Sequence, residues 1–141
     1  MASGAKLIGR EAMQAKLRRF MAKFPSAEAA ALFFEAGVEM SESKKRCPVY
    51  SPPRGGYVDH VGGTLRASGH VLKPVTEGRK ISVDLVYGGA AEAYAVVQHE
   101  GLDFHHNVGQ ARYLASVLEE SEATMAQRIA ARVQFNEEML R

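Results

Sequence analysis

Metal-ligand residue types gather in one short stretch of this 141-residue chain. His99 and Glu100 are adjacent, and His105 and His106 follow after a short spacer. Imidazole nitrogens and carboxylate oxygens are the groups that hold a catalytic zinc ion, but this spacing differs from the two histidines four positions apart that mark a zinc protease helix. Two interpretations stay open. One is a metal-dependent hydrolase. In the other, His99 and Glu100 hydrogen-bond at a strand end and His105 and His106 lie in a loop.

Covalent catalysis would have to use Cys47, Thr64 or Ser68 as the nucleophile. Ser68 lacks the Gly-x-Ser-x-Gly frame of a nucleophile elbow. The glycine pairs Gly55-Gly56 and Gly62-Gly63 lack the preceding strand and following helix that would aim amides at a phosphate. Cys47 is the only cysteine, so we expect a small packed side chain rather than a disulfide or a cysteine metal site. The sequence therefore favours a protein that is not an enzyme and has no cofactor.

Basic residues form two short groups that could face DNA phosphates, because such contacts need only charge and position. The net charge of +2 is small for a protein that holds nucleic acid by charge. Few aromatic residues lie among the basic ones, which argues against a stacking platform for single strands. A DNA-binding surface and an ordinary solvated helix face are both open for Arg18, Arg19, Lys44, Lys45 and Arg46.

Composition indicates one globular domain over residues 1–141. Apolar residues make up 46% and charged residues 24%, which is typical of water-soluble proteins. A chain of this length buries one core. No run approaches the ~18 apolar residues of a membrane span, and Met1–Arg10 lacks the apolar middle of a signal peptide. We therefore expect a protein made in the cytoplasm, without membrane contact.

Two helices are predicted at the start of the chain. The first runs from about Arg10 to Lys23 and ends at Pro25, because the residue before proline is pushed out of the helical region. Ser26 is placed to cap the second, which continues to the basic cluster before Pro48. The apolar face expected on the first helix is Met13, Leu17, Phe20, Met21 and Phe24, and the core residues expected on the second are Phe33, Phe34, Val38 and Met40.

A loop and a small antiparallel sheet are predicted next. Residues 48–63 hold three prolines and four glycines, and a loop of this length is either functional or mobile. Leu65–Val75 is expected to be an edge strand because it contains Pro74. Alternating apolar residues predict a second strand, and Ala93–His99 predicts a third. The alternating residues are Ile81, Val83, Leu85 and Tyr87.

A long last helix is predicted from about Gln110 to near Met139, with Asn107 as its cap. At ~1.5 Å per residue it would exceed about 40 Å, so part of it should pack on another subunit or on the first two helices. The expected class is α+β, with an antiparallel sheet of about three to four strands packed against two N-terminal helices and one long C-terminal helix.

Three passages between Cys47 and Leu114 together resemble a known family. They are Cys47-Pro48-Val49 leading to Gly63-Thr64-Leu65-Arg66-Ala67-Ser68-Gly69, then Tyr94-Ala95-Val96-Val97-Gln98-His99-Glu100, then Gly109-Gln110-Ala111-Arg112-Tyr113-Leu114. In this order they are similar to bacteriophage head–tail connection or tail-completion proteins. The chain departs from that pattern by an insertion of residues 50–62 between the first two motif segments.

The resemblance implies a structural protein of the virion, made in the host cytoplasm and placed at the head–tail interface of a tailed phage or related particle. It implies a homo-oligomeric ring of six copies, with twelve as the alternative. The ring would contact a portal, adaptor or stopper protein on the head side and a tail terminator or tail tube on the other. Non-specific contact with packaged double-stranded DNA is a further expectation. A minor capsid-associated protein is a further alternative.

Candidate assembly residues follow from this resemblance. Arg66 offers a two-pronged donor to a carboxylate or phosphate, and Tyr94 and His99 offer amphipathic contacts at a sheet end. We expect Arg66→Ala to leave the monomer folded and to weaken assembly. The full candidate set is Tyr50, Arg54, Tyr57, His60, Arg66, Tyr94, His99, Glu100, His105, His106, Arg112 and Tyr113.

Overall fold

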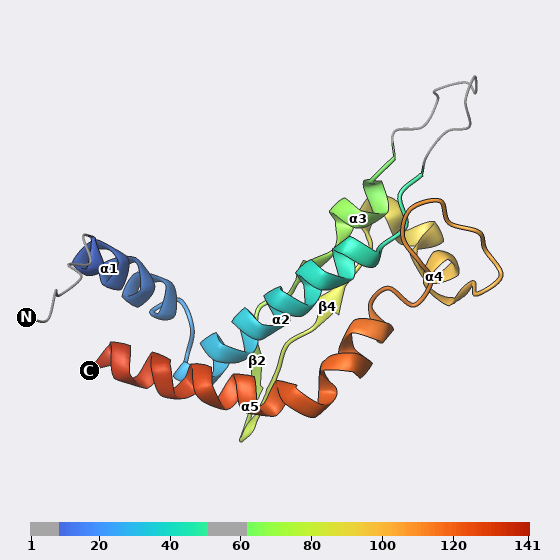
Figure 1. Cartoon of the computed structure of the whole chain (residues 1–141). Helices are drawn as coiled ribbons and strands as arrows, with labels where there is room; N and C mark the ends of the chain where they lie inside the picture. The colour runs from blue at the N-terminus through green and yellow to red at the C-terminus, as the bar shows by residue number, and fades with distance from the viewer. Residues whose placement is uncertain (1–8, 51–61) are drawn as a thin grey trace, which may run out of the picture.

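A computed structural model describes residues 9–50 and 62–141, and its class is α+β, as predicted. Long helices dominate, and four short strands lie between them (Figure 1). None of the described helices is long and apolar enough to cross a lipid bilayer. The elements are α1 (Arg10–Met21), α2 (Ala27–Arg46), α3 (Thr64–Ser68), β1 (His70–Val71), β2 (Val75–Glu77), β3 (Lys80–Ser82), β4 (Leu85–Val86), the 3-10 turn η1 (Gly89–Ala91), α4 (Glu92–Glu100) and α5 (Ala115–Leu140).

The boundaries of α2 agree with the sequence prediction. The hydroxyl oxygen of Ser26 accepts a 3.1 Å hydrogen bond from the amide of Ala29, which satisfies one of the free donors of the first turn. At the other end Cys47 is already extended, as expected for a residue that precedes proline. The predicted cap and stop of this helix are therefore confirmed.

The predicted apolar face of α1 is only partly covered. Met21 is buried, whereas Met13 is 53% exposed. The rings of Phe20 and Phe24 lie 5.1 Å apart, and Phe24 lies 5.1 Å from Phe33 of α2, so an aromatic row joins the end of α1 to α2. The helix itself is confirmed, but its first turns leave apolar side chains in contact with solvent.

Helix α5 packs antiparallel along α2. Near the start of α2, the side-chain amide of Asn136 donates to the carbonyl oxygen of Ala27 at 3.1 Å. Near the end of α2, the guanidinium of Arg46 donates to both carboxylate oxygens of Glu120 at 2.8 and 2.6 Å. The 26 residues of α5 span about 39 Å. The expectation that the last helix packs on the first two helices is confirmed.

The predicted start of this last helix is wrong. It begins at Ala115 rather than near Gln110, and Asn107 does not cap it. The reason lies in the backbone, because Gly109 and Arg112 both adopt positive φ, at 87° and 52°. Left-handed residues interrupt a right-handed helix, so residues 111–114 form turns instead.

Small and acidic side chains, rather than aromatic ones, form the buried face of α2. Met40 is in the core as predicted, but Phe34 and Val38 are exposed, so that prediction is wrong for these two. The face toward α5 carries Glu35 and Glu39, which bind arginines of α5, and the alanines allow close approach of the helices. The buried alanines of α2 are Ala29, Ala30, Ala31 and Ala36.

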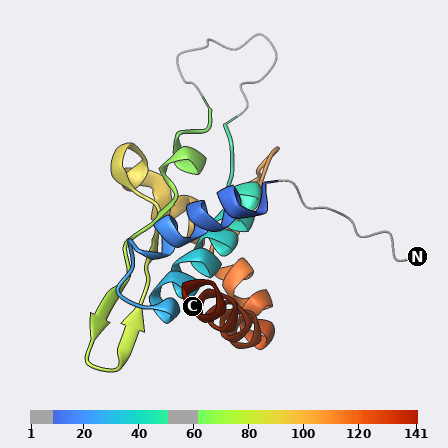
Figure 2. The ribbon, with the colours of Figure 1, turned by 90° about the vertical axis from the view of Figure 1, so that its left-hand side faces the viewer.

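The strands form two two-stranded antiparallel sheets, which follow one another along a narrow ribbon, rather than one wider sheet. Strand β1 pairs with β4, and β2 pairs with β3 across a turn at Gly78 and Arg79. The amide of Leu72 bonds the carbonyl oxygen of Asp84 at 2.9 Å between the two ladders. Pro74 has no amide hydrogen, which explains why the ladder breaks there. Figure 2 shows the ribbon extending to one side of the helices.

Two predicted strands are helices in the structure. The first part of Leu65–Val75 is α3, bounded by Gly63 and Gly69, because Leu, Arg and Ala favour a helix turn. Ala93–His99 lies within α4, where Ala95 is buried one helical turn after the buried Ala91 of η1. Its β-branched residues suit a strand by propensity, but the helix buries the small side chains instead.

The molecule has two distinct ends joined by α2. Helix α1 and the C-terminal part of α5 lie at one end, and α3, α4 and the turns before α5 lie at the other (Figure 1). The 20 residues of α2 separate these ends by about 30 Å.

Candidate functional site

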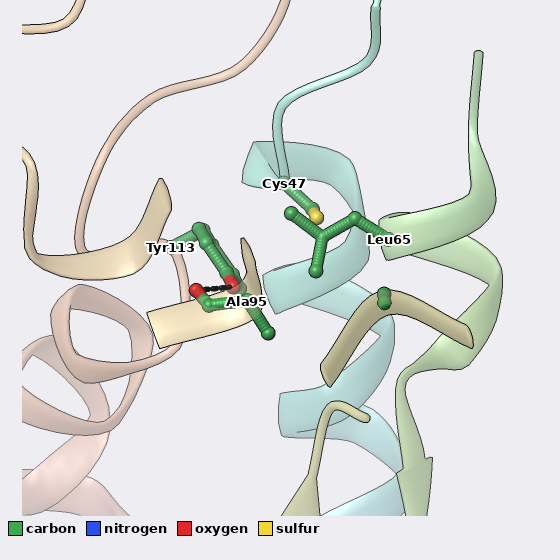
Figure 3. Close-up of a cluster of buried hydrophobic side chains, with 5 residues drawn as sticks. Cys47, Leu65, Ala95 and Tyr113 are labelled. Carbon is green, nitrogen blue, oxygen red and sulfur yellow. Dashed lines mark hydrogen bonds between the residues drawn. The ribbon is translucent and has the colours of Figure 1, made fainter. Parts of the chain in front are cut away.

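The three passages singled out in the sequence meet at one buried cluster. Cys47 follows α2, Leu65 belongs to α3, Ala95 to α4, and Tyr113 to the turn before α5 (Figure 3). Ala91 completes the cluster, and Tyr87, Tyr94 and Leu114 pack around it. The motif residues therefore fix how four elements meet at the α4 end of the molecule.

Tyr113 lies at the centre of this cluster and is 1% exposed. Its hydroxyl donates a 3.0 Å hydrogen bond to the carbonyl oxygen of Ala95. Its ring contacts Tyr87 and His99 edge to face, with centroids 4.9 Å apart in both pairs. Burial raises the pKa of the Tyr113 hydroxyl well above its ordinary value. Tyr113 was a candidate assembly residue, and the structure corrects this by placing it in the core of the single chain.

His99 uses both ring nitrogens within the chain. The amide of Ala115 donates to its Nε2 at 3.3 Å, so Nδ1 carries the proton and donates to Glu100 at 2.5 Å. His99 thus binds the first amide of α5. The hydrogen-bonding interpretation of this pair is confirmed, although it lies at the end of a helix rather than a strand.

The four residues proposed as metal ligands do not form one set. His105 and His106 lie in the loop after α4, as expected in the alternative to metal binding. In the part of the chain that the structure describes, no group of three His, Cys, Asp or Glu side chains is placed to hold a metal ion. The hydrolase hypothesis gains no support from this geometry.

The side chain of Arg66 hydrogen-bonds to a backbone carbonyl rather than extending fully into solvent. Its Nη2 donates to the carbonyl oxygen of Cys47 at 3.0 Å, which ties α3 to the end of α2. Its Nε is buried and, among the described residues, has no hydrogen-bond partner. This assembly candidate therefore also contributes to the fold.

Two of the candidate nucleophiles, Cys47 and Ser68, are held in packing or hydrogen-bond contacts within the chain. Cys47 is fully buried, and burial raises the pKa of its thiol to about 11, so the thiol is protonated at neutral pH. The hydroxyl of Ser68 donates to the carbonyl oxygen of Leu65 at 2.7 Å and accepts from the amide of Gly88 at 3.3 Å. Cys47 is confirmed as a packed side chain.

A hollow of about 440 Å³ lies beside the buried cluster. Its lining comes from the segment that follows α2, the start of α3, α4 and the loop after α4. Four candidate assembly residues meet there, although they are far apart in the sequence. They are Tyr50, Tyr94, His105 and His106.

Apolar side chains of α4 and of the loop after it are exposed to solvent, and one of them, Phe104, also lines the hollow. Val96 and Leu102 are 70% and 72% exposed, and Val97 and Phe104 are about half exposed. The Phe104 ring packs against Gly101, where an added Cβ would lie 2.3 Å from the ring. Sequence analysis missed this group, which we call the α4 patch (Val96, Val97, Leu102 and Phe104). A helical interpretation of residues 92–100 would have placed Val96 and Val97 opposite the buried alanines.

Of the remaining assembly candidates, the structure describes Arg112, whereas three others lie outside the described residues. Arg112 holds its backbone at φ 52°, donates its amide to the carbonyl oxygen of His99 at 2.7 Å, and pairs its exposed side chain with Glu119. Three candidates from the 48–63 loop lie outside the described residues. They are Arg54, Tyr57 and His60.

The candidate DNA-facing residues do not form one surface. Arg18 and Arg19 belong to α1, and Lys44–Arg46 ends α2, about 30 Å away along that helix. Hydrogen bonding to Glu120 raises the pKa of Arg46 and lowers that of the Glu120 carboxyl. Lys45 contacts Glu42 at 2.5 Å. Two of the three cations at the end of α2 are therefore paired within the chain.

Comparison of the chain with protein-family models, with curated protein sequences and with solved structures finds no match.

Proposed function

We propose that this chain is a structural subunit of the neck of a tailed bacteriophage or phage-like particle, where copies form a ring between the DNA-filled head and the tail. The order of the three motif passages carries this proposal, as it resembles that of tail-completion proteins. Support comes from their meeting at one buried cluster beneath an exposed apolar patch.

The exposed groups at the α4 end suit a partner surface better than a reaction centre. Val96 and Leu102 expose most of their side chains, and a group of exposed apolar side chains is typical of protein interaction sites. The polar motif residues His99 and Arg66 bind backbone groups instead of an open reactive position. A ring of six copies, or alternatively of twelve, would cover these surfaces between a portal-side protein and a tail-side protein.

Removal of the protein from its particle tests this function. A nonsense mutation in the phage gene should yield DNA-filled heads and separate tails, because the joint between them is incomplete. Supplying the wild-type chain from a plasmid should restore joined particles. Electron microscopy of lysates counts the two populations, and reconstruction of restored particles should locate the chain in the neck. Joined particles formed without the chain, or a chain located in the capsid shell, would disprove the proposal.

A further inference from the structure

A second apolar surface lies at the opposite end of the molecule from the α4 patch. Helices α1, α2 and α5 enclose a groove of about 390 Å³, which we call the α1–α5 groove. Met13 of α1, Phe34 of α2 and Phe135 of α5 line it and are about half exposed. Its apolar side chains are thus open to solvent, like those of the α4 patch.

The charges around the two surfaces are opposite. Residues 10–24 contain five Lys or Arg and one Glu, whereas residues 88–111 contain three acidic residues and no Lys or Arg before Arg112. The groove lining itself includes Lys16 and Arg132 and no carboxylate. Arg132 lies over the Phe34 ring at 4.0 Å and is paired with Glu35 at 3.1 Å, so the positive charge beside the groove comes mainly from Lys16 and the other basic residues of α1. The exposed acidic residues near the α4 patch are Glu92, Glu100 and Asp103.

From these features we propose that the α4 patch of one copy docks into the α1–α5 groove of the next. Apolar contact would bury Leu102 and Phe104 against Met13 and Phe135, and the opposite charges would orient the two copies. The α4 patch of one copy does not reach the α1–α5 groove of the same copy, since α2 holds the two surfaces about 30 Å apart.

Such a contact joins two different patches, so each added copy leaves one patch and one groove open. Rotation between neighbours then closes a ring, and this consequence rests on the proposed function. The contact between two copies is a property of the chain alone and is measurable without the particle.

Two variants at exposed positions separate the two surfaces. Leu102→Glu disables the patch, and Met13→Glu disables the groove while keeping a strong helix former in α1. Each variant alone should sediment as a monomer, with self-association weakened more than about tenfold, because a carboxylate would be buried in an apolar contact. In Met13→Glu the new carboxylate would also face the acidic residues beside the partner copy's patch. Val75→Glu on β2 is a matched control, being as exposed as Met13, and should associate like wild type.

Mixing the two variants gives the decisive measurement. The intact groove of the Leu102→Glu chain should accept the intact patch of the Met13→Glu chain, so an equimolar mixture should form dimers and stop there. Sedimentation velocity at low ionic strength reads this directly, and added salt should weaken the dimer. Monomers in the mixture, or a wild-type chain that stays monomeric up to about 1 mM, would overturn the inference.

The result also separates this inference from the proposed function. Wild-type oligomers that both variants leave intact would show a ring built through other surfaces, and so reject only the docking contact. Mixed dimers from a chain that heads and tails do not need for joining would reject only the neck function.

Discussion

The hydroxyl of Tyr113 donates a 3.0 Å hydrogen bond to the carbonyl oxygen of Ala95, and this bond ties the turn before α5 to helix α4. Both residues lie in the buried cluster that also holds Cys47 and Leu65. The position of α4 relative to α5 therefore depends on a side chain that makes its contacts inside the single chain.

Tyr113→Phe should cost about 1 kcal/mol of unfolding free energy, because one hydrogen bond is lost and the ring contacts stay. Tyr113→Ala should cost about 3–5 kcal/mol, since it also leaves a cavity in the cluster. Urea unfolding followed by circular dichroism measures both. Equal losses in the two variants would show that the ring packing contributes little.

Gly109 approaches the end of α2 more closely than any side chain allows. A Cβ there would lie 2.6 Å from the carbonyl carbon and oxygen of Cys47, and the residue has φ 87°. Gly109→Ala should therefore destabilise the fold by about 3 kcal/mol or more. Gly37→Ala is the matched control, because that site in α2 has open space and alanine favours the helix by about 1 kcal/mol. Opposite shifts in melting temperature are expected.

Local signals in the sequence were sufficient for the two ends of α2. Ser26 and Pro48 define the ends of α2 through interactions that involve only neighbouring residues. The same reasoning failed for α4, because Val96 and Val97 favour a strand by propensity while burial of Ala91 and Ala95 requires a helix. That choice depends on tertiary packing, which a local pattern does not contain.

The motif residues of the candidate site were predicted, but their hydrogen-bond partners in other elements were not. The motif passages identified Tyr113, His99 and Arg66, and the structure gives each a bond to backbone. These partners come from other elements, and their pairing has no signature in sequence spacing. Likewise, Glu35 and Arg128 are 93 positions apart and gave no signal in the sequence.

The buried carboxylate of Glu35 joins two arginines of α5 to α2. It is 1% exposed and bonds Nε of Arg128 at 2.5 Å and Nε of Arg132 at 3.1 Å. Glu35→Gln should lower the unfolding free energy by about 2 kcal/mol, less than for a fully buried pair because the arginines are about a third exposed. Glu42→Gln removes an exposed pair with Lys45 and should change stability by less than about 0.5 kcal/mol. Chemical denaturation compares the two, and equal effects would contradict the role of burial.

Alkaline pH should destabilise the protein partly through Cys47. Burial raises the pKa of its thiol to about 11 from 9.0, so between these values the unfolded chain loses this proton while the folded chain keeps it. Because the unfolded state then binds fewer protons, stability falls as pH rises, by about 2 kcal/mol from this group.

The difference in unfolding free energy between wild type and Cys47→Ala should therefore narrow from pH 8 to pH 11. Tyr87, whose pKa burial raises to about 12, is present in both proteins, so its contribution cancels apart from the smaller part of its shift that Cys47 itself causes. A constant gap would contradict the prediction.

Arg66 tests whether a motif residue serves the fold, the assembly or both. Its Nη2 bond to the carbonyl oxygen of Cys47 should be worth about 1–2 kcal/mol, so Arg66→Ala should lower stability by that amount and still fold. Arg66→Lys keeps the charge but loses the planar fork, and it should recover only part of the stability.

Thermal unfolding of these Arg66 variants measures the folding role, and complementation of a phage lacking the gene measures assembly. If Arg66 also contacts a neighbour, Arg66→Ala should reduce joined particles more than Gln98→Ala, a variant of another residue lining the adjacent hollow. An Arg66→Ala chain that does not fold would show that its role is structural alone.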